Sequence, residues 1–243
     1  TGFLLLHDAT TGELLSLMDA EHLTAMRTGA ASAIATDLLA LKDASVATVF
    51  GTGAQAETQL EGVCRVRPIR SVYAVGRDDA KTEAFAKTMA DRLGCRVEAT
   101  SDRARAVRES QIVCTATTSV EPVFAGSDVQ PGTHINAVGA FREDMRELDE
   151  DVIQRARVYV DQIEAAKRGA GEIIQPVLRG TFSWDRLAGE LGGLINRRLA
   201  GRESRDEITV FKSVGVSVQD AFVARSIFEQ ASNLDLGKLV DLH

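Results

Sequence analysis

The sequence has little of what marks several broad classes of protein. It contains only three cysteines, and Cys64, Cys95 and Cys114 show no C-x-x-C spacing, so they predict neither a disulfide framework nor a zinc site. No apolar run approaches the ~20 residues that cross a bilayer, and no basic start followed by an apolar run marks a signal peptide. The net charge of -7 argues against a broad basic surface for nucleic acid or anionic membranes. We therefore expect a cytoplasmic protein without a metal site and with neither nucleic acid nor membrane as a partner.

What the chain does have is enough apolar material for a packed core. Hydrophobic residues make up 44% of 243 positions, which suits one large domain, or one domain with part of another. The chain begins at Thr1 rather than at a methionine and runs almost at once into the strand-like segment 3–6. From this we expect that an upstream segment is cut away or not represented.

A glycine turn follows the apolar run 47–50 and precedes a predicted helix. Gly51 would permit a tight turn, Gly53 would let the backbone approach a pyrophosphate, and Ala56 would let the helix pack closely on the strand. Free N–H groups at about 53–55 would face the phosphates, aided by the helix dipole. The context of strand, turn and helix predicts a dinucleotide-binding turn, and the alternative is a structural turn without a phosphate.

From Val46 onward, predicted strands and helices alternate, which indicates a parallel sheet with helices on both faces. The predicted strands are 46–50, 71–75, 96–98, 111–115, 133–138 and 157–160, and the predicted helices are 54–66, 79–92 and 102–108.

Predicted elements also flank this alternating region. A hairpin of strands 3–6 and 14–18 comes first, and Asp19 can cap a helix over 20–41. One side of that helix would be apolar and would carry Leu23, Met26, Ala30, Ala33, Ile34 and Leu38. The later predicted elements are a helix at 184–199, a strand at 207–211 and a helix at 217–231.

In a doubly wound sheet the ligand lies beyond the carboxyl ends of the strands. Three segments of small or hydroxyl-bearing residues follow predicted strands, namely Thr115–Ser119, Gly139–Ala140 and Lys212–Gly215. They could form a cofactor site, and for the first of them a polar loop with helix caps is the alternative.

Five groups of residues, in this order, resemble the ornithine cyclodeaminase/μ-crystallin family. They are Leu23–Ala30, Gly51–Ala56, Val75–Arg77, Gly132–Gly139 with Arg146–Asp149, and Phe211–Gly215 with Asp220. The resemblance implies a homodimer whose Rossmann domain is inserted into a substrate and dimerisation domain. Members include ornithine cyclodeaminases, alanine dehydrogenases and reductases of cyclic imino acids such as pyrroline-2-carboxylate.

The resemblance also implies an α/β fold and a domain plan. The doubly wound, NAD(P)-binding Rossmann domain would occupy 42–215. Residues 1–41 would be a remnant of the substrate/dimerisation domain with a linking helix, and 216–243 would be a C-terminal helix that returns to that domain.

Two residues carried over from the family bear on substrate. Arg27 would bind the substrate carboxylate, because its planar fork meets a carboxylate bidentately; an interdomain ion pair is the alternative. Asp220 is the candidate catalytic group that would orient the substrate, with a structural role equally open. His134, inside an apolar strand, is expected to be a packed or hydrogen-bonded core histidine.

The reaction is predicted from a departure from the family pattern. Cyclodeaminases carry an acid where this chain has Phe141, and a phenyl ring cannot do acid–base chemistry. Asp144 lies nearby, but we expect it to be a solvated loop acid. We therefore favour an oxidoreductase that transfers hydride between NAD(P)H and a small amino or imino acid. The alternatives are an ornithine cyclodeaminase and a non-catalytic, μ-crystallin-like protein that binds NADPH and a ligand.

The cofactor preference is predicted from the end of the second strand, where an NAD enzyme usually has an acid. Here Gly76 and Arg77 stand instead, and Lys81 could add charge, so NADP(H) is favoured and NAD(H) remains possible. Asp78 could hold a ribose hydroxyl or cap the next helix. The predicted cofactor-binding residues are Thr28, Gly51, Thr52, Gly53, Ala54, Gln55, Gly76, Arg77, Thr115, Ala116, Thr117, Val138, Gly139, Ser213, Val214 and Gly215.

Overall fold

The computed structural model describes residues 2–240, and these divide into two compact units. The large unit is Thr28–Gly215, and the small unit contains the residues up to Arg27 and those from Val216 onward. The domain limits at 41/42 and 215/216 stay predictions. The outermost residues of the predicted terminal segments, 1 and 241–243, lie outside the described residues.

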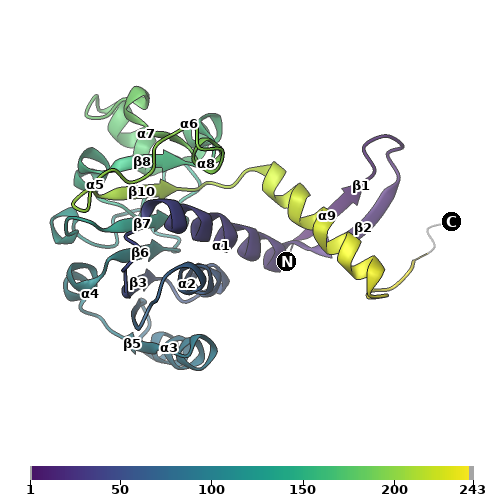
Figure 1. Ribbon diagram of the computed structural model, residues 1–243, viewed down its shortest axis with the longest axis horizontal. Coiled ribbons are helices and arrows are strands. Elements are labelled where there is room, and N and C mark those ends of the chain that lie inside the picture. The colour runs from purple at the N-terminus through teal and green to yellow at the C-terminus, as the bar shows by residue number, and fades with distance from the viewer. Residues whose placement is uncertain (1, 241–243) are drawn as a thin grey trace. The chain divides into compact units, whose positions relative to one another are not determined.

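The large unit is built on one eight-stranded sheet (Figure 1). Its strand order is β5-β4-β3-β6-β7-β10-β8-β9, and every neighbouring pair is parallel. The strands are β3 (Val46–Phe50), β4 (Ser71–Val75), β5 (Arg96–Ala99), β6 (Ile112–Thr115), β7 (His134–Ala137), β8 (Arg157–Val160), β9 (Gly189–Glu190) and β10 (Thr209–Lys212). The order reverses between β3 and β6, which confirms the predicted doubly wound fold.

Helices connect the strands of this sheet. The α-helices are α2 (Ala54–Val66), α3 (Asp79–Leu93), α4 (Arg103–Glu109), α5 (Glu150–Arg155), α6 (Ile163–Gly169), α7 (Gly171–Leu178) and α8 (Leu191–Ile195), and the short 3₁₀ helices are η1 (Gly126–Asp128) and η2 (Trp184–Arg186). Helix α1 (Ala20–Leu39) runs through the boundary of the two units.

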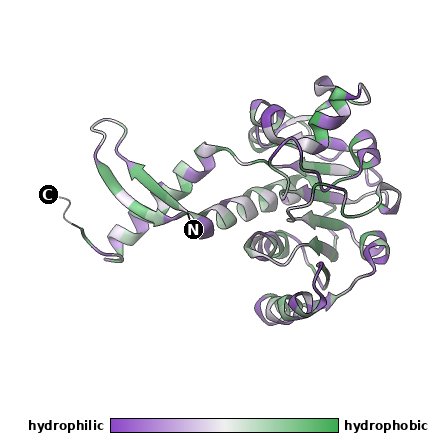
Figure 2. Cartoon of the chain, turned by 180° about the vertical axis from the view of Figure 1, so that it is seen from behind, coloured by the Kyte–Doolittle hydropathy of each residue, from purple (hydrophilic) through white to green (hydrophobic). Residues whose placement is uncertain are grey.

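Both faces of the sheet are buried, and most residues of its central strands are apolar (Figure 2), although β7 and β10 also bury His134, Asn136, Thr209 and Lys212. In β6, Ile112 and Cys114 belong to one hydrophobic cluster, whereas Val113 between them belongs to the cluster on the opposite face. Successive residues of a strand point to opposite faces, so an apolar run of this kind needs cover on both sides.

The predicted helix over 184–199 is wrong. This segment forms η2, the short strand β9 and helix α8 instead. Gly189 adopts a φ of +134°, which other residues rarely adopt, and the side chain of Leu199 packs so closely that a Cβ on Gly189 would lie 2.3 Å from it. These contacts require glycine and a non-helical backbone at position 189, so the segment does not form the continuous helix that its apolar pattern predicts.

The predicted apolar side of α1 is also partly wrong. Leu23 is buried, but Met26, Ile34 and Leu38 are exposed. The buried side instead includes small and hydroxyl-bearing residues, and its members are Thr28, Ala31, Ser32, Ala35, Thr36 and Leu39. Small residues at the contact let helices approach closely: a Cβ on Gly29 would lie 2.6 Å from the Thr58 carbonyl oxygen of α2.

The small unit contains an antiparallel hairpin and helix α9 (Ser217–Asn233). The strands are β1 (Phe3–His7) and β2 (Leu14–Asp19), as the turn chemistry predicts. Asp19 also caps α1, because its Oδ1 accepts the His22 N–H at 2.8 Å. Across residues 2–240, no helix combines the length and apolar character needed to span a bilayer.

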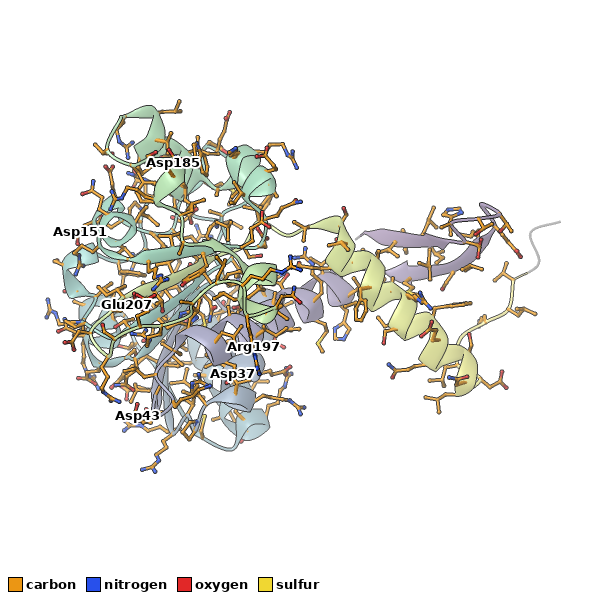
Figure 3. The ribbon with its side chains drawn as sticks, turned by 45° about the horizontal axis from the view of Figure 1, so that its top comes forward. Asp37, Asp43, Asp151, Asp185, Arg197 and Glu207 are labelled. Carbon is orange, nitrogen blue, oxygen red and sulfur yellow. The ribbon has the colours of Figure 1, made fainter. Side chains whose placement is uncertain are left out.

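Charged side chains near the amino ends of the strands are joined in ion pairs. Asp37 pairs with Arg67 at 2.9 Å and Asp43 with Arg205 at 2.9 Å; Figure 3 labels both acids. Arg67, which is buried, also donates to the Thr36 carbonyl oxygen near the end of α1. These pairs satisfy the charges of this edge within the protein.

Candidate functional site

A cavity of about 420 Å³ opens at the carboxyl ends of β3, β4 and β6, where the strand order reverses. This is the position at which doubly wound sheets bind their ligands. The loops after the three strands supply most of its wall, and the lining residues are Phe50, Gly51, Thr52, Gly53, Val75, Gly76, Arg77, Arg103, Ala116, Thr117, Thr118, Ser119, Glu121, Pro122 and Val123.

The turn after β3 requires glycine at its first position. Gly51 adopts a φ of +111°, and a Cβ there would lie 2.5 Å from the Ala116 carbonyl oxygen. Its N–H donates to the Val75 carbonyl oxygen at 2.9 Å, which ties the turn to the end of β4. Gly51 therefore serves the fold, as the sequence predicts.

Gly53 has no comparable structural reason to be glycine. Its φ is -99°, and a Cβ built on it would meet nothing within 4 Å. It is the N-cap of α2 and provides no side-chain cap, so the first amides of that helix have no capping acceptor. The Oε1 of Gln55, in the first turn, is also buried without a hydrogen-bond partner. Open space beside uncapped helix amides fits a phosphate group.

The loop after β4 combines a sterically required glycine with a free cation. A Cβ on Gly76 would lie 2.2 Å from the Thr82 hydroxyl, so packing against α3 excludes any side chain there. Arg77 lines the cavity, and no hydrogen bond or ion pair joins it to the rest of residues 2–240. Asp78 caps α3 by accepting the Lys81 N–H at 3.0 Å, which was one of the two roles considered for it.

Arg103 is a second cation on the cavity wall, and it was missed in the sequence. It begins α4, and its guanidinium donates to the Val123 carbonyl oxygen at 3.3 Å. The residue gave no local signal, because an arginine at the start of a short helix usually lies in solvent.

A buried carboxylate, Glu147, joins the loops that follow β6 and β7. Its oxygens accept the Thr115 hydroxyl at 2.8 Å, the Thr117 N–H at 2.6 Å and the Gly139 N–H at 2.7 Å. Burial raises the pKa of Glu147 above its ordinary value, whereas the charge of Lys212 acts in the opposite direction. Accepting three hydrogen bonds and donating none is the behaviour of an ionised carboxylate.

Two more charged groups are buried beside Glu147. Lys212, at the end of β10, pairs with Glu172 of α7 at 3.2 Å, and both side chains are fully buried. The Lys212 ammonium also donates to the Ala140 carbonyl oxygen, and Glu172 accepts the Glu147 N–H at 3.2 Å. Lys212 therefore links the end of β10 to the chain that leaves β7.

The turn after β10 is held by a different acid, Asp161, which follows β8. One of its oxygens accepts the Ser213 hydroxyl at 3.0 Å, the Val214 N–H at 2.9 Å and the Gly215 N–H at 2.6 Å. Gly215 has a φ of +81°, the left-handed conformation that such a turn requires.

Arg27 and Asp220 are brought together in the small unit. The Arg27 Nε donates to the Asp220 carboxylate at 2.9 Å, and Nη1 donates to the Gln219 Oε1 at 3.3 Å. The arginine side chain is 11% exposed and the aspartate 27%. The alternative predicted for Arg27 is an interdomain ion pair, whereas this pair lies within the small unit, and its acid is the candidate catalytic group.

Three residues near the strands occupy positions that the sequence analysis anticipates. His134 is fully buried between Thr209 and Asn136, and burial lowers its pKa to about 3, so it is a neutral core residue. Asp144 is exposed and pairs with Arg142. Phe141 is 55% exposed at the position considered for a cyclodeaminase base.

The predicted cofactor residues fall into three groups. Seven line the cavity: Gly51, Thr52, Gly53, Gly76, Arg77, Ala116 and Thr117. Five others donate hydroxyl or amide hydrogens to buried carboxylates: Thr115 and Gly139 to Glu147, and Ser213, Val214 and Gly215 to Asp161. Outside the cavity wall lie Ala54 and Gln55 in the first turn of α2, Val138 after β7, and Thr28 within α1. Within the described part of the chain, no cluster of three or more His, Cys, Asp or Glu side chains could hold a metal ion.

Comparison with known proteins places the chain among oxidoreductases. It matches the ornithine cyclodeaminase/mu-crystallin family over residues 1–235. It is 39% identical to a Δ1-pyrroline-2-carboxylate reductase of Bacillus cereus over 99% of this chain and 74% of that protein. A structure of Thermococcus litoralis Δ1-pyrroline-2-carboxylate reductase with NADH and L-proline superposes with a TM-score of 0.95, at 38% identity over 97% of this chain and 73% of the other. An archaeal alanine dehydrogenase dimer with bound NAD gives a TM-score of 0.93, at 36% identity over 99% and 74%.

Proposed function

Because the chain belongs to the ornithine cyclodeaminase/mu-crystallin family, we propose that it is an NAD(P)H-dependent reductase of a small cyclic imino acid such as pyrroline-2-carboxylate. The observation that carries the proposal is the cavity at the reversal of strand order, with the uncapped amides of α2 and open space at Gly53 on its wall. Similarity to two pyrroline-2-carboxylate reductases supports the choice of an imine as the substrate.

Different residues of the cavity would bind different parts of the cofactor. The turn at Gly51–Gly53 and the start of α2 would hold the pyrophosphate, and Arg77 would hold the adenosine end. The second half of a dinucleotide then lies beyond β6 and β7, next to Thr117 and Gly139. When bound, NAD(P)H supplies the hydride that reduces the C=N carbon, while the imine nitrogen takes up a proton.

On the substrate side, Arg27 would bind the carboxylate of the imino acid. Asp220 accepts from the Arg27 Nε and Gln219 from its Nη1, so the guanidinium is already oriented, which limits the conformations that it must lose on binding. We expect KM for the imino acid to rise at least tenfold in Arg27→Ala, with a smaller change in the KM for the cofactor. An unchanged KM for the imino acid would remove Arg27 from the substrate site.

For the cofactor we propose a preference for NADPH over NADH. Arg77 has no partner within the described residues, and Gly76 leaves no carboxylate to repel a 2′-phosphate. A charge-assisted hydrogen bond of about 1.5–3 kcal/mol corresponds to a preference of roughly tenfold to a hundredfold. Dissociation constants for NADPH and NADH measure this preference directly, and equal values would refute it.

The activity is tested by following NADPH and NADH consumption by the full-length protein with Δ1-pyrroline-2-carboxylate. We expect consumption that depends on the imine and yields proline in equal amount. Pyruvate with ammonia is the comparison substrate, since an alanine-dehydrogenase-like enzyme would prefer it.

Two other outcomes would replace the proposal. Tight cofactor binding without turnover of any cyclic imine or 2-oxo acid would identify a non-catalytic, μ-crystallin-like binding protein. Release of ammonia from ornithine without an added reductant would identify a cyclodeaminase, which Phe141 argues against because it supplies no base.

We also propose that the protein is a homodimer, since the similar archaeal alanine dehydrogenase is a dimer. Light scattering on the full-length protein would give twice the monomer mass, and a monomer mass would contradict this.

A further inference from the structure

Glu147 holds two separate segments through their backbone N–H groups. Thr117 lies on the cavity wall after β6, and Gly139 follows β7. Both donate their N–H groups to the same carboxylate, at 2.6 and 2.7 Å, and Thr115 adds its hydroxyl. No regular ladder of strand hydrogen bonds continues past this point, so the carboxylate takes over the pairing of the two chains.

The packing around this carboxylate leaves no space for adjustment. A Cβ on Gly139 would lie 2.2 Å from the Thr117 carbonyl oxygen and 2.4 Å from the Glu147 Oε1. Glu147 itself is fully buried, and its backbone is fixed on both sides: its N–H donates to Glu172 and its carbonyl oxygen accepts the Val123 N–H at 2.8 Å. The position of Thr117 and Gly139 is therefore set by a buried side chain whose own backbone is hydrogen-bonded on both sides.

The carboxylate accepts three hydrogen bonds from the protein, from Thr115, Thr117 and Gly139. The positive charge of Lys212 lies in the same buried region. Its ammonium group pairs with Glu172 and donates to the Ala140 carbonyl oxygen. A group with this arrangement does not need to touch a ligand to affect its binding, because it acts through the backbone that forms the wall.

We propose that Glu147 is the positioning residue for the nicotinamide half of the cofactor, acting through the amides of Thr117 and Gly139. The inference rests on the proposed function, since it requires a dinucleotide whose second half lies beyond β6 and β7. The adenosine half belongs to the turn at Gly51–Gly53 and to Arg77, which Glu147 does not contact.

The test compares NADPH with ADP, which lacks the nicotinamide half and the 2′-phosphate, in Glu147→Gln. The variant has nearly the same shape, but its amide can present only one acceptor oxygen. With the oxygen toward Thr115 and Gly139, its NH₂ group would face the Thr117 N–H, donor against donor. We expect the dissociation constant for NADPH to rise at least tenfold, whereas that for ADP changes by less than about twofold. Titrations are made on folded full-length protein below its unfolding transition.

Two further variants separate positioning from general damage. Glu147→Asp keeps the charge on a shorter side chain, and we expect an NADPH affinity between those of the wild type and Glu147→Gln. Glu164→Gln removes an exposed acid paired with Lys167 and should match the wild type for both ligands.

The outcomes distinguish this inference from the proposed function. Equal losses for ADP and NADPH in Glu147→Gln would show a general structural role and overturn the positioning role, as would unchanged binding of both ligands. If Glu147→Gln does not fold, Thr115→Val, which removes one donor to Glu147, replaces it and should weaken NADPH more than ADP. Failure of the wild-type protein to bind any dinucleotide would instead refute the proposed function.

Discussion

The carboxyl edge of the sheet has two halves that differ in whether their charged groups are bonded within the protein. We call the half around β4, β3 and α2 the open half, and the half around β7, β10 and β8 the buried half. Around β4, β3 and α2, Arg77 is exposed and has no partner among residues 2–240, and the start of α2 has no side-chain cap. Around β7, β10 and β8, the charged groups are buried and bonded to the protein, and they are Glu147, Asp161, Glu172 and Lys212.

The two halves therefore have different roles: the first can bind a charged ligand, and the second fixes the backbone around it. Unpartnered donors in the first half are available to a ligand that brings its own negative charge, such as a phosphate. In the second half the four buried charged groups are bonded to one another or to the backbone, so they can shape the wall of the site but offer little charge to a ligand. Variants in the first half should therefore change ligand affinity with little effect on stability. Variants in the second half should change stability and, where they displace the wall of the site, ligand affinity as well.

The largest effect is expected from Lys212→Met. It removes the cation next to Glu172 and leaves two buried carboxylates without compensation, which should lower the free energy of unfolding by about 3–5 kcal/mol. Urea unfolding followed by far-UV circular dichroism measures the change. Lys167→Met is the control, because its pair with Glu164 is exposed and should contribute less than about 1 kcal/mol. Similar losses in the two variants would remove the contrast between buried and exposed pairs.

A smaller effect is expected from pH, and it too belongs to the buried half. His134 has a pKa of about 3 in the folded protein and about 6.5 when unfolded. Below pH 6.5 the unfolded chain binds a proton that the folded chain does not, so stability is complete above pH 6.5 and falls as the pH drops toward 3. The contribution lost by pH 5 is about 2 kcal/mol.

His134→Gln tests this, because glutamine does not titrate and can still bond to Thr209 and Asn136. Urea unfolding at about pH 7.5 and about pH 5 measures the free energy of unfolding at each pH. The difference between the two values should be smaller by about 2 kcal/mol in the variant than in the wild type. An equal pH dependence in both proteins would show that His134 is not the source.

The smallest of these effects is expected in the open half, from Arg77→Ala. We expect about tenfold weaker NADPH binding, little change for NADH, and an unchanged unfolding midpoint, because Arg77 has no partner within the described residues. Lys87→Ala, on α3 away from the cavity wall, is the matched control. A lower unfolding midpoint in Arg77→Ala would show that this arginine stabilises the folded protein.

The open half was largely predictable from the sequence, because its signals are local. The strand, the turn at Gly51 and the start of α2 lie within a few residues of each other, and each has its own pattern. The pairing of Arg27 with Asp220 was not predictable in this way, since 193 positions separate them.

The buried half could not be predicted for the same reason. Glu147 stands in a polar stretch beside Asp144, and nothing in the order of residues distinguishes the fully buried acid from the exposed one. Two of its three partners, Thr115 and Thr117, lie 32 and 30 residues away, so burial depends on the assembled sheet. The family resemblance included this glutamate in a motif, but the role of its side chain required the structure.

The most direct test of the account is the affinity of Gly53→Ala for NADPH. A Cβ on Gly53 meets no protein atom within 4 Å, so the variant should fold without a clash, and only the less favourable N-cap should lower its unfolding temperature slightly. Gly192→Ala is the matched control, because a Cβ there also meets nothing. If the turn holds a pyrophosphate, Gly53→Ala should bind NADPH at least tenfold more weakly while Gly192→Ala binds normally. Wild-type affinity in Gly53→Ala would contradict the assignment of this edge as the dinucleotide site.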